Sequence, residues 1–147
     1  MSALDIALAP GSIRLKQECK DYSEAIFLAG TALEQSGRTK SIYTKQMHDA
    51  FVELGPYMVI AEGIALAHAR PSEAVISAGL SLVTLKSPVE FGSQRFDPVS
   101  LVFGLAAVDH DGHIDLMAAL SELLMDEAKV KILLQAENEG QVRAVFG

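Results

Sequence analysis

The sequence lacks a second cysteine and any long apolar run. Its one cysteine, Cys19, excludes an internal disulfide and lies in a polar stretch with no histidine nearby, which is typical of a bystander thiol. No apolar run approaches the roughly 20 residues that a membrane-spanning helix needs. The first residues, Met1 to Asp5, have no basic region and do not resemble a signal peptide. These absences predict a cytoplasmic protein.

Basic residues are also scarce, which argues against nucleic acid or an anionic membrane as the partner. The chain has 12 lysines and arginines against 19 aspartates and glutamates, a net charge of −7. The surplus is uneven, because residues 97–147 hold 3 basic and 9 acidic side chains. A solvated acidic helical surface explains this distribution; a docking face for a basic partner protein is the alternative.

The hydrophobic pattern indicates one globular α/β domain over residues 1–147. Hydrophobic residues make up 50% of the chain, and no repeat or linker divides it. Apolar side chains at three- and four-residue spacing predict helices over 22–36 and 41–54, the second capped by Ser41. Weak alternation at 12–18 predicts a short edge strand. Apolar runs with the length of buried strands cover 57–60, 64–67, 78–85 and 99–108.

The helical period returns after Gly112. It predicts a helix over about 113–125 and shorter helices over 127–135 and 138–146. A hairpin-like pairing around Pro88 to Gly92 favours a mixed sheet over a purely parallel one. Together these elements predict a three-layer α/β sandwich, a mixed β-sheet with helices on both faces.

His68 is the first candidate functional residue. It follows an apolar strand and precedes Arg70 and Pro71, so it lies where strands present side chains to solvent and ligands. An imidazole has an unperturbed pKa of about 6.5, which suits it to chemistry near neutral pH. His48, in contrast, lies within a predicted helix beside Asp49, and we expect it to be a surface or packing residue.

Two more histidines, His110 and His113, lie between the last predicted strand and the helix that follows it. Such a junction lies at the end of the sheet, where open α/β folds place their ligand sites. It is also next to a helix N-terminus, whose free N–H groups favour anions such as phosphate. Two strand exits can thus bring imidazoles, one of them His68, to one shallow site.

Three chemistries use two histidines. Residues 109–120 fail the calcium-loop pattern, since Leu120 occupies the twelfth position, but a zinc site of His68, His113 and a carboxylate stays open. Hydrolysis with a histidine as base is disfavoured, because the sequence contains no nucleophile-elbow motif. In a phosphoryl relay, a histidine is itself the nucleophile, a second one donates to the phosphoryl group, and Arg70 adds charge-assisted bonds. Without a Walker-type glycine loop, ATP is not expected as the direct donor.

Four segments together closely resemble one family. They are Gly55 to Pro71, the run Leu82 to Phe91, the pair Asp97-Pro98, and Ala106 to Asp109 followed by His113. They resemble enzyme IIA of the bacterial phosphotransferase system, of the mannitol/fructose type and within it the ascorbate-type group. The resemblance covers nearly the whole chain and is strongest from residue 55 to 113.

The resemblance implies an α/β sandwich and a phosphocarrier without cofactor or metal. His68 matches the histidine that takes a phosphoryl group from the phosphocarrier protein HPr and passes it to a cysteine of enzyme IIB. The membrane enzyme IIC then imports the carbohydrate, here an ascorbate-like one. His113 matches the second active-site histidine, which stabilises the phosphoryl group, and Arg70 is the auxiliary cation. A homodimer is left open.

The sequence also departs from the family pattern. Ala67 stands where the family often has proline before the active histidine, which leaves the local backbone less restricted. The mannitol branch has an arginine upstream of that histidine, and none lies between Arg38 and Arg70 here, in better agreement with the ascorbate-like group. Glu62 either orients His68 or caps a turn, the turn being favoured, and His110 is expected to be solvent-exposed. The alternative function is a regulatory domain whose histidine phosphorylation switches protein binding without transport.

Overall fold

The computed structural model describes residues 2–147, in which five strands form one mixed sheet. The strand order is β1-β4-β5-β3-β2. β1 is parallel to β4 and β3 is parallel to β5, whereas β4–β5 and β2–β3 are antiparallel. This confirms the predicted mixed sheet, with β1 as the predicted edge strand. The strands are β1 (Ile13–Gln17), β2 (Val59–Ala61), β3 (Ile64–His68), β4 (Gly79–Val89) and β5 (Val99–Ala106).

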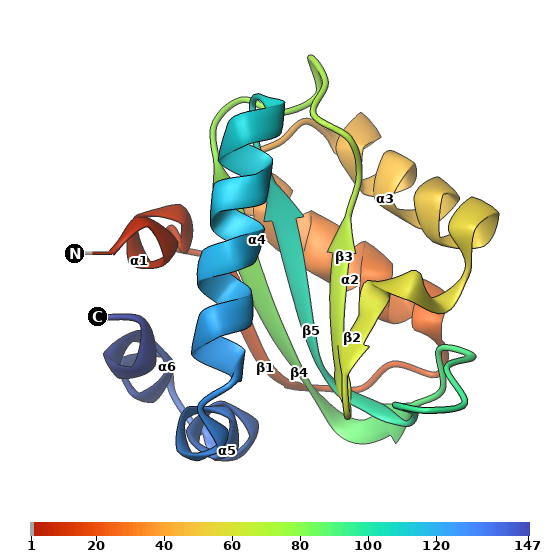
Figure 1. The fold of residues 1–147 in the computed structure, drawn as a ribbon, viewed down its shortest axis with the longest axis vertical. Helices are drawn as coiled ribbons and strands as arrows, with labels where there is room; N and C mark the ends of the chain where they lie inside the picture. Colours follow the sequence, from red (N-terminus) through yellow and green to blue (C-terminus); the bar gives the residue numbers. More distant parts are fainter. Residues whose placement is uncertain (1) are drawn as a thin grey trace.

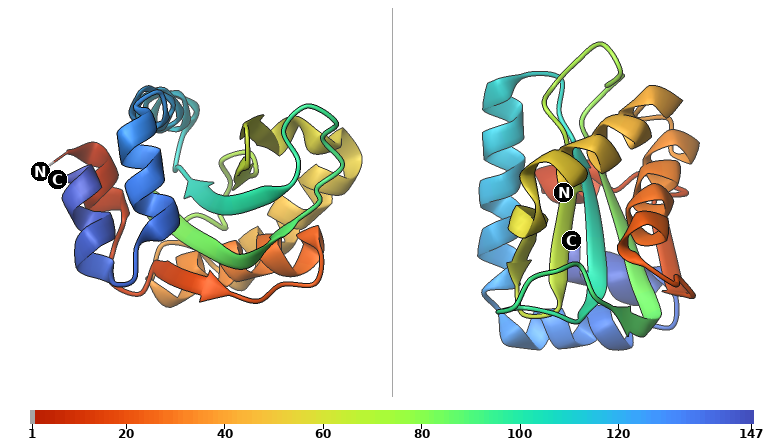
Figure 2. Two further views of the ribbon diagram at one scale, coloured as in Figure 1. Left: turned by 90° about the horizontal axis from the view of Figure 1, so that it is seen from below. Right: turned by 90° about the vertical axis from the view of Figure 1, so that its right-hand side faces the viewer.

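Helices cover both faces of this sheet, which confirms the three-layer sandwich (Figure 1). α2 (Tyr22–Gln35) and α3 (Ser41–Leu54) cover one face. The other face carries the predicted C-terminal helices and a short N-terminal helix that the sequence pattern did not predict. Figure 2 shows the two helical layers with the sheet between them and the chain ends close together. The elements of this second layer are α1 (Ala3–Ala7), α4 (His110–Leu124), α5 (Glu127–Gln135) and α6 (Glu139–Phe146).

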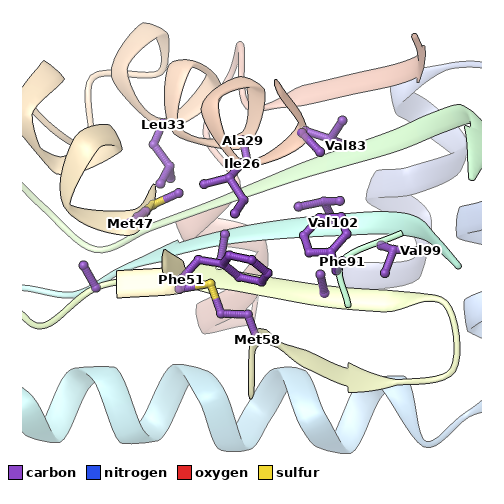
Figure 3. Packing of buried hydrophobic residues seen from close by; sticks show 14 of the residues in the cluster. Ile26, Ala29, Leu33, Met47, Phe51, Met58, Val83, Phe91, Val99 and Val102 are labelled. Carbon is purple, nitrogen blue, oxygen red and sulfur yellow. The ribbon is translucent and has the colours of Figure 1, made fainter. Parts of the chain in front are cut away.

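Each face of the sheet has its own hydrophobic core. Along β3, Ala65 and Ala67 pack in the α2/α3 core, while Ile64 and Leu66 pack in the core on the α4 side. Successive strand side chains point to opposite faces, so a strand covered on both sides is apolar at every position. This explains the unbroken apolar runs in the sequence. Figure 3 shows the α2/α3 core, where Met47 and Phe51 of α3 approach the strands.

Two details differ from the sequence predictions, the cap residue of α3 and the end of β4. Ser41 does not cap α3: the cap residue is Lys40, which makes no side-chain capping bond, and its N–H donates to the carbonyl of Ala74 at 2.8 Å. β4 continues past the predicted end at residue 85 as far as Val89. The pairing of β4 with β5 is irregular before Val89, and Pro88, which has no N–H to donate, lies in this irregular part. The hairpin connection therefore begins only at residue 90.

Close packing between α2 and β5 leads to a stability prediction. A Cβ added at Gly104 would meet the Ser81 hydroxyl and lie 3.2 Å from the carbonyl oxygen of Ala29. We expect Gly104→Ala to lower the free energy of unfolding by about 1–3 kcal/mol, because overpacking forces backbone or side chains to shift. Urea denaturation measures this loss, and adding Ser81→Ala should recover part of it. An unchanged urea midpoint would contradict this packing.

Candidate functional site

The predicted site residues line one groove of about 1020 Å³ at the end of the sheet where β3 and β5 finish. Its walls are α3, the 3-10 turn η1 (Pro56–Met58), the residues that follow β3, and the first turns of α4. His68, Arg70, His110 and His113 all line this groove, although they come from two segments 40 positions apart in the sequence. The convergence of His68 with the 110–113 segment is thus a feature of the structure.

His68 owes its place to the alternation along β3. It is the last residue of the strand and two positions beyond Leu66, so its side chain points to the α4 side of the sheet. Its partner in the neighbouring strand is Leu105, at the last pair of the β3–β5 ladder. The imidazole is half-buried, which leaves part of it accessible to the groove.

The position of His113 depends on where α4 begins. This helix begins earlier than predicted. The helix begins at His110 instead of about residue 113, and β5 ends at Ala106 instead of 108. The carboxylate of Asp109 accepts the N–H of Gly112 at 2.7 Å, so Asp109 is the N-cap and draws residues 110–112 into the helix. His113 therefore lies in the first turns of a capped helix, where its direction is defined.

The two imidazoles lie edge to face. The ring centroids of His68 and His113 are 5.2 Å apart, and the ring planes meet at 76°. Both residues are half-buried. The sequence predicted that two imidazoles would share one site, and the structure identifies them as this adjacent pair.

A backbone contact selects the tautomer of His68. Its Nδ1 lies 2.9 Å from the carbonyl oxygen of Leu66, and a carbonyl oxygen only accepts hydrogen bonds. Nδ1 must therefore carry the proton, which leaves the lone pair of the neutral ring on Nε2. The ring thus has the form that a nitrogen nucleophile requires.

The environment lowers the pKa of His113 from its usual value of 6.5. Burial is the largest cause, because it disfavours the charged form, and the neighbouring His68 and His110 add smaller repulsive effects. His113 is therefore mainly neutral near pH 7, and one of its ring nitrogens carries an N–H that can donate.

This shift leads to a prediction about pH. We expect NMR titration to give His113 a midpoint below 6.5, and His68→Ala to raise the midpoint only in part, since burial remains. A folded pKa below the unfolded one means that the unfolded chain binds more protons. The contribution of His113 to stability is therefore present above about pH 6.5 and is lost as the pH falls below that value. A midpoint at or above 6.5 would contradict the burial of the ring.

The other candidate residues from the sequence lie at the groove, in a turn or between two helices. Arg70 is exposed on the groove, and within residues 2–147 its side chain makes no hydrogen bond or ion pair. His110 is exposed, as expected. Glu62 lies in the turn between β2 and β3, about 20 Å along the chain from His68. Within residues 2–147 its side chain makes no hydrogen bond or ion pair, so it neither orients the imidazole nor caps the turn. His48 packs between α2 and α3, where its Nε2 lies 2.8 Å from the Ser23 hydroxyl.

Cys19 has no part in this groove. It lines a separate hollow with Glu18, Lys20, Glu24 and Ser87. Burial, followed by the carboxylates of Glu24 and Asp21, raises the pKa of the thiol, so that it stays protonated and weakly nucleophilic. This agrees with the bystander prediction.

Two further structural findings bear on the sequence analysis. Within residues 2–147, no His, Cys, Asp or Glu side chains form a group of three that could hold a metal ion, so His68 and His113 gain no third ligand there. Across the same range, no helix combines the length and the apolar composition that a bilayer crossing needs.

The apolar rim of the groove was not predicted from the sequence. Leu54, Tyr57 and Ile114 expose 60%, 82% and 50% of their surface at this end of the molecule. Exposed apolar side chains that gather around a polar site mark a protein-binding surface. A sequence pattern does not show which apolar residues stay exposed. One sequence signal for this rim is that Leu54 and Tyr57 flank the Gly55-Pro56 helix break, where apolar side chains can leave the core.

Comparison with known proteins places this geometry in context. Residues 7–147 match the family model described as phosphoenolpyruvate-dependent sugar phosphotransferase system, EIIA 2. The mannitol-specific cryptic phosphotransferase enzyme IIA component of Escherichia coli strain K12 is 36% identical over 135 residues, which cover 92% of this chain and 91% of that protein. A solution structure under that name from Escherichia coli superposes with a TM-score of 0.85 at 34% identity, over 98% of this chain and 97% of that one.

Two further similar proteins are an ascorbate-specific component and a mannitol enzyme IIA. The ascorbate-specific EIIA component of Escherichia coli strain K12 is 36% identical over 132 residues, 89% of this chain and 86% of that protein. The mannitol enzyme IIA of Escherichia coli, solved in complex with phosphorylated enzyme IIB, has a TM-score of 0.83 at 26% identity and covers 94% of this chain and 95% of its own. The family match spans nearly the whole chain and agrees with the mixed sandwich. The chain therefore belongs to the EIIA type 2 family of the phosphoenolpyruvate-dependent sugar phosphotransferase system, whose members are phosphotransferase components.

Proposed function

We propose that this protein is a cytoplasmic phosphocarrier, with residues 1–147 acting as one domain, and that His68 takes a phosphoryl group from phospho-HPr. The Nδ1–H···O=C bond from His68 to Leu66 is the observation that carries the proposal, because it leaves the lone pair on Nε2. Nε2 forms a bond to phosphorus while the bond between phosphorus and the HPr donor atom breaks. The proton stays on Nδ1, hydrogen-bonded to the carbonyl oxygen of Leu66, so the tautomer does not have to change during the step.

His113 and Arg70 stabilise the transferred group in this proposal. The His113 ring is adjacent to His68 on the groove, and its N–H can donate to a phosphoryl oxygen without competing for phosphorus. Arg70, two residues after His68, has a guanidinium group free to add a charge-assisted bond. Catalysis of phosphoryl transfer depends mainly on such positioning and charge stabilisation.

The phosphoryl group then leaves for enzyme IIB. A cysteine thiolate of that protein attacks phosphorus, the P–Nε2 bond breaks, and His68 returns to its neutral form. The apolar rim of Leu54, Tyr57 and Ile114 around the histidines supports docking of a protein at this place. Asp49 and Glu53 on the same wall favour a basic partner surface. The neighbour solved with phosphorylated enzyme IIB supports enzyme IIB as a partner.

We assign the uptake of an ascorbate-like carbohydrate, through enzyme IIC, as the purpose of this relay. Relatives named for ascorbate and for mannitol are equally identical to this chain, at 36%. The segment between Arg38 and Arg70 lacks the upstream arginine of the mannitol branch, and this favours the ascorbate-like assignment.

Reconstitution of the relay tests the proposal. The protein is incubated with phosphoenolpyruvate, enzyme I and HPr, and its intact mass is measured without acid, because phosphohistidine is acid-labile. We expect the gain of one phosphoryl group, and its loss when an ascorbate-type enzyme IIB is added. A stable phosphoprotein that no enzyme IIB discharges would favour a regulatory role, and no mass gain would contradict the relay. A mannitol-type enzyme IIB is the control for the carbohydrate assignment.

A further inference from the structure

The hydroxyl of Tyr43 binds the backbone at the point where the site residues leave the sheet. Tyr43 lies in the first turn of α3 and is fully buried. Its oxygen is 2.7 Å from the carbonyl oxygen of Leu105 and 3.0 Å from the amide nitrogen of Ala69. The carbonyl oxygen of Ala69 lies 3.1 Å away. One hydroxyl therefore contacts both β5 and the residue that follows His68.

These contacts coincide with the end of the β3–β5 ladder. His68 pairs with Leu105 at the last position of that ladder. Beyond it, β3 leads into the groove loop at Ala69, and β5 leads through Ala106 to the helix that carries His113. Backbone groups at such a divergence lose their ladder partners and, when buried, need a replacement. The Tyr43 hydroxyl supplies this replacement on both strands.

The hydroxyl is suited to this bridge because it can donate and accept at once. Its single proton goes to the nearer carbonyl, that of Leu105, while its oxygen accepts the N–H of Ala69. Burial raises the pKa of Tyr43 to about 12, although the bond with Ala69 opposes the shift. The phenol therefore keeps its proton throughout the neutral range.

We propose that Tyr43 is a positioning residue for His68 and acts through the backbone of Ala69 and Leu105. Tyr43 packs in the α2/α3 core, whereas the side chain of His68 points to the opposite face of the sheet. Direct contact with the reacting atoms is therefore not its role. Two hydrogen bonds on either side of His68 form the link. The Tyr43 hydroxyl accepts the N–H of Ala69, the residue after His68, and the His68 ring bonds the carbonyl of Leu66 in β3. Its effect on phosphoryl transfer rests on the proposed function, but its effect on the His68 ring does not.

Tyr43→Phe isolates the hydroxyl, because the ring still fills the core. The N–H of Ala69 then lies buried without its acceptor, and the strand end must shift to find another. We expect the Nδ1–Leu66 bond of His68 to weaken and the tautomer with the proton on Nε2 to become populated. That tautomer cannot attack phosphorus through Nε2, so phosphoryl acceptance should slow by about tenfold.

Three measurements on the 147-residue protein test this assignment. Nitrogen-15 NMR of the imidazole reports the His68 tautomer in wild type and in Tyr43→Phe, and quench-flow with phospho-HPr gives the acceptance rate. Tyr22→Phe is the matched control, because Tyr22 packs against the same core and its hydroxyl makes no hydrogen bond within residues 2–147. The control should leave both the tautomer and the rate unchanged. Amide hydrogen exchange of Ala69 in wild type supplies a test that needs no variant.

The outcomes separate this inference from the proposed function. If Tyr43→Phe keeps a wild-type His68 tautomer and rate, Tyr43 is only a core residue and the inference is wrong. If Tyr43→Phe does not fold, exchange at Ala69 decides: protection supports the bridge, and exchange as fast as at Arg70 overturns it. If wild type takes no phosphoryl group, the proposed function fails, while the tautomer comparison still tests the role of Tyr43.

Discussion

His68→Ala is expected to take up no phosphoryl group from phospho-HPr, the largest effect we predict. The variant lacks the nitrogen that would bond to phosphorus. His113 does not replace it, because the centre of its ring lies 5.2 Å from that of His68 and its plane is turned by 76°. The fold should persist, since His68 is only half-buried and lies at the very end of β3. The loss should therefore be one of chemistry, visible with a native circular dichroism spectrum.

The matched control for this variant is His110→Ala. His110 lies in the same groove, is also a histidine, and is exposed. The control should accept the phosphoryl group at nearly the wild-type rate, measured by intact mass over a time course. Full phosphorylation of His68→Ala would remove His68 from the mechanism, whereas loss of acceptance in His110→Ala would show that the wrong histidine of the groove has been assigned.

His113→Ala is expected to slow phosphoryl acceptance by about 100-fold and to leave the acceptor in place, as found when a single donor to a developing anion is removed elsewhere. The lost group is an N–H adjacent to the His68 ring. The phosphoprotein should still form at long times, so the end point stays the same and the rate changes. His113→Gln retains a donor of shorter reach and should recover part of the rate.

Phosphorylation offers a second measurement on His113. A phosphoryl group on His68 brings negative charge beside a ring whose pKa is lowered by burial and by two neighbouring imidazoles. Opposite charge favours the protonated ring, so the midpoint of His113 should rise when His68 is phosphorylated. An NMR titration of the phosphoprotein tests this directly. An unchanged midpoint, together with a wild-type rate for His113→Ala, would show that His113 does not face the phosphoryl group.

Much of the layer architecture was predictable, because it depends on periodic burial that the sequence records directly. The helix predicted over 22–36 is Tyr22–Gln35, and the one over 41–54 is Ser41–Leu54. The helices over 127–135 and 138–146 were also predicted within one residue. Apolar side chains at helical spacing, or in runs of strand length, have few alternatives to burial in a chain of this size. The same reasoning located His68 at the exit of β3.

The errors occurred where a single contact outweighed the local pattern. The capping bond from Asp109 to Gly112 starts α4 at His110, although the apolar period begins later. α3 begins at Ser41 without a side-chain cap, and the N–H of Lys40 before it donates to the carbonyl of Ala74. A periodicity averages over several turns, whereas a cap depends on one hydrogen bond, so boundaries are less predictable than the elements themselves.

By itself, the sequence determined the class of fold and the residue types available for chemistry, because composition and period follow from the order of side chains. Only the tertiary structure decided which imidazoles meet, which nitrogen of His68 keeps the proton, and that Tyr43 joins the ends of β3 and β5. These depend on angles and distances between segments that are far apart in the chain. Hydrogen bonds act over about 3 Å, and no sequence spacing specifies separations that small between distant residues.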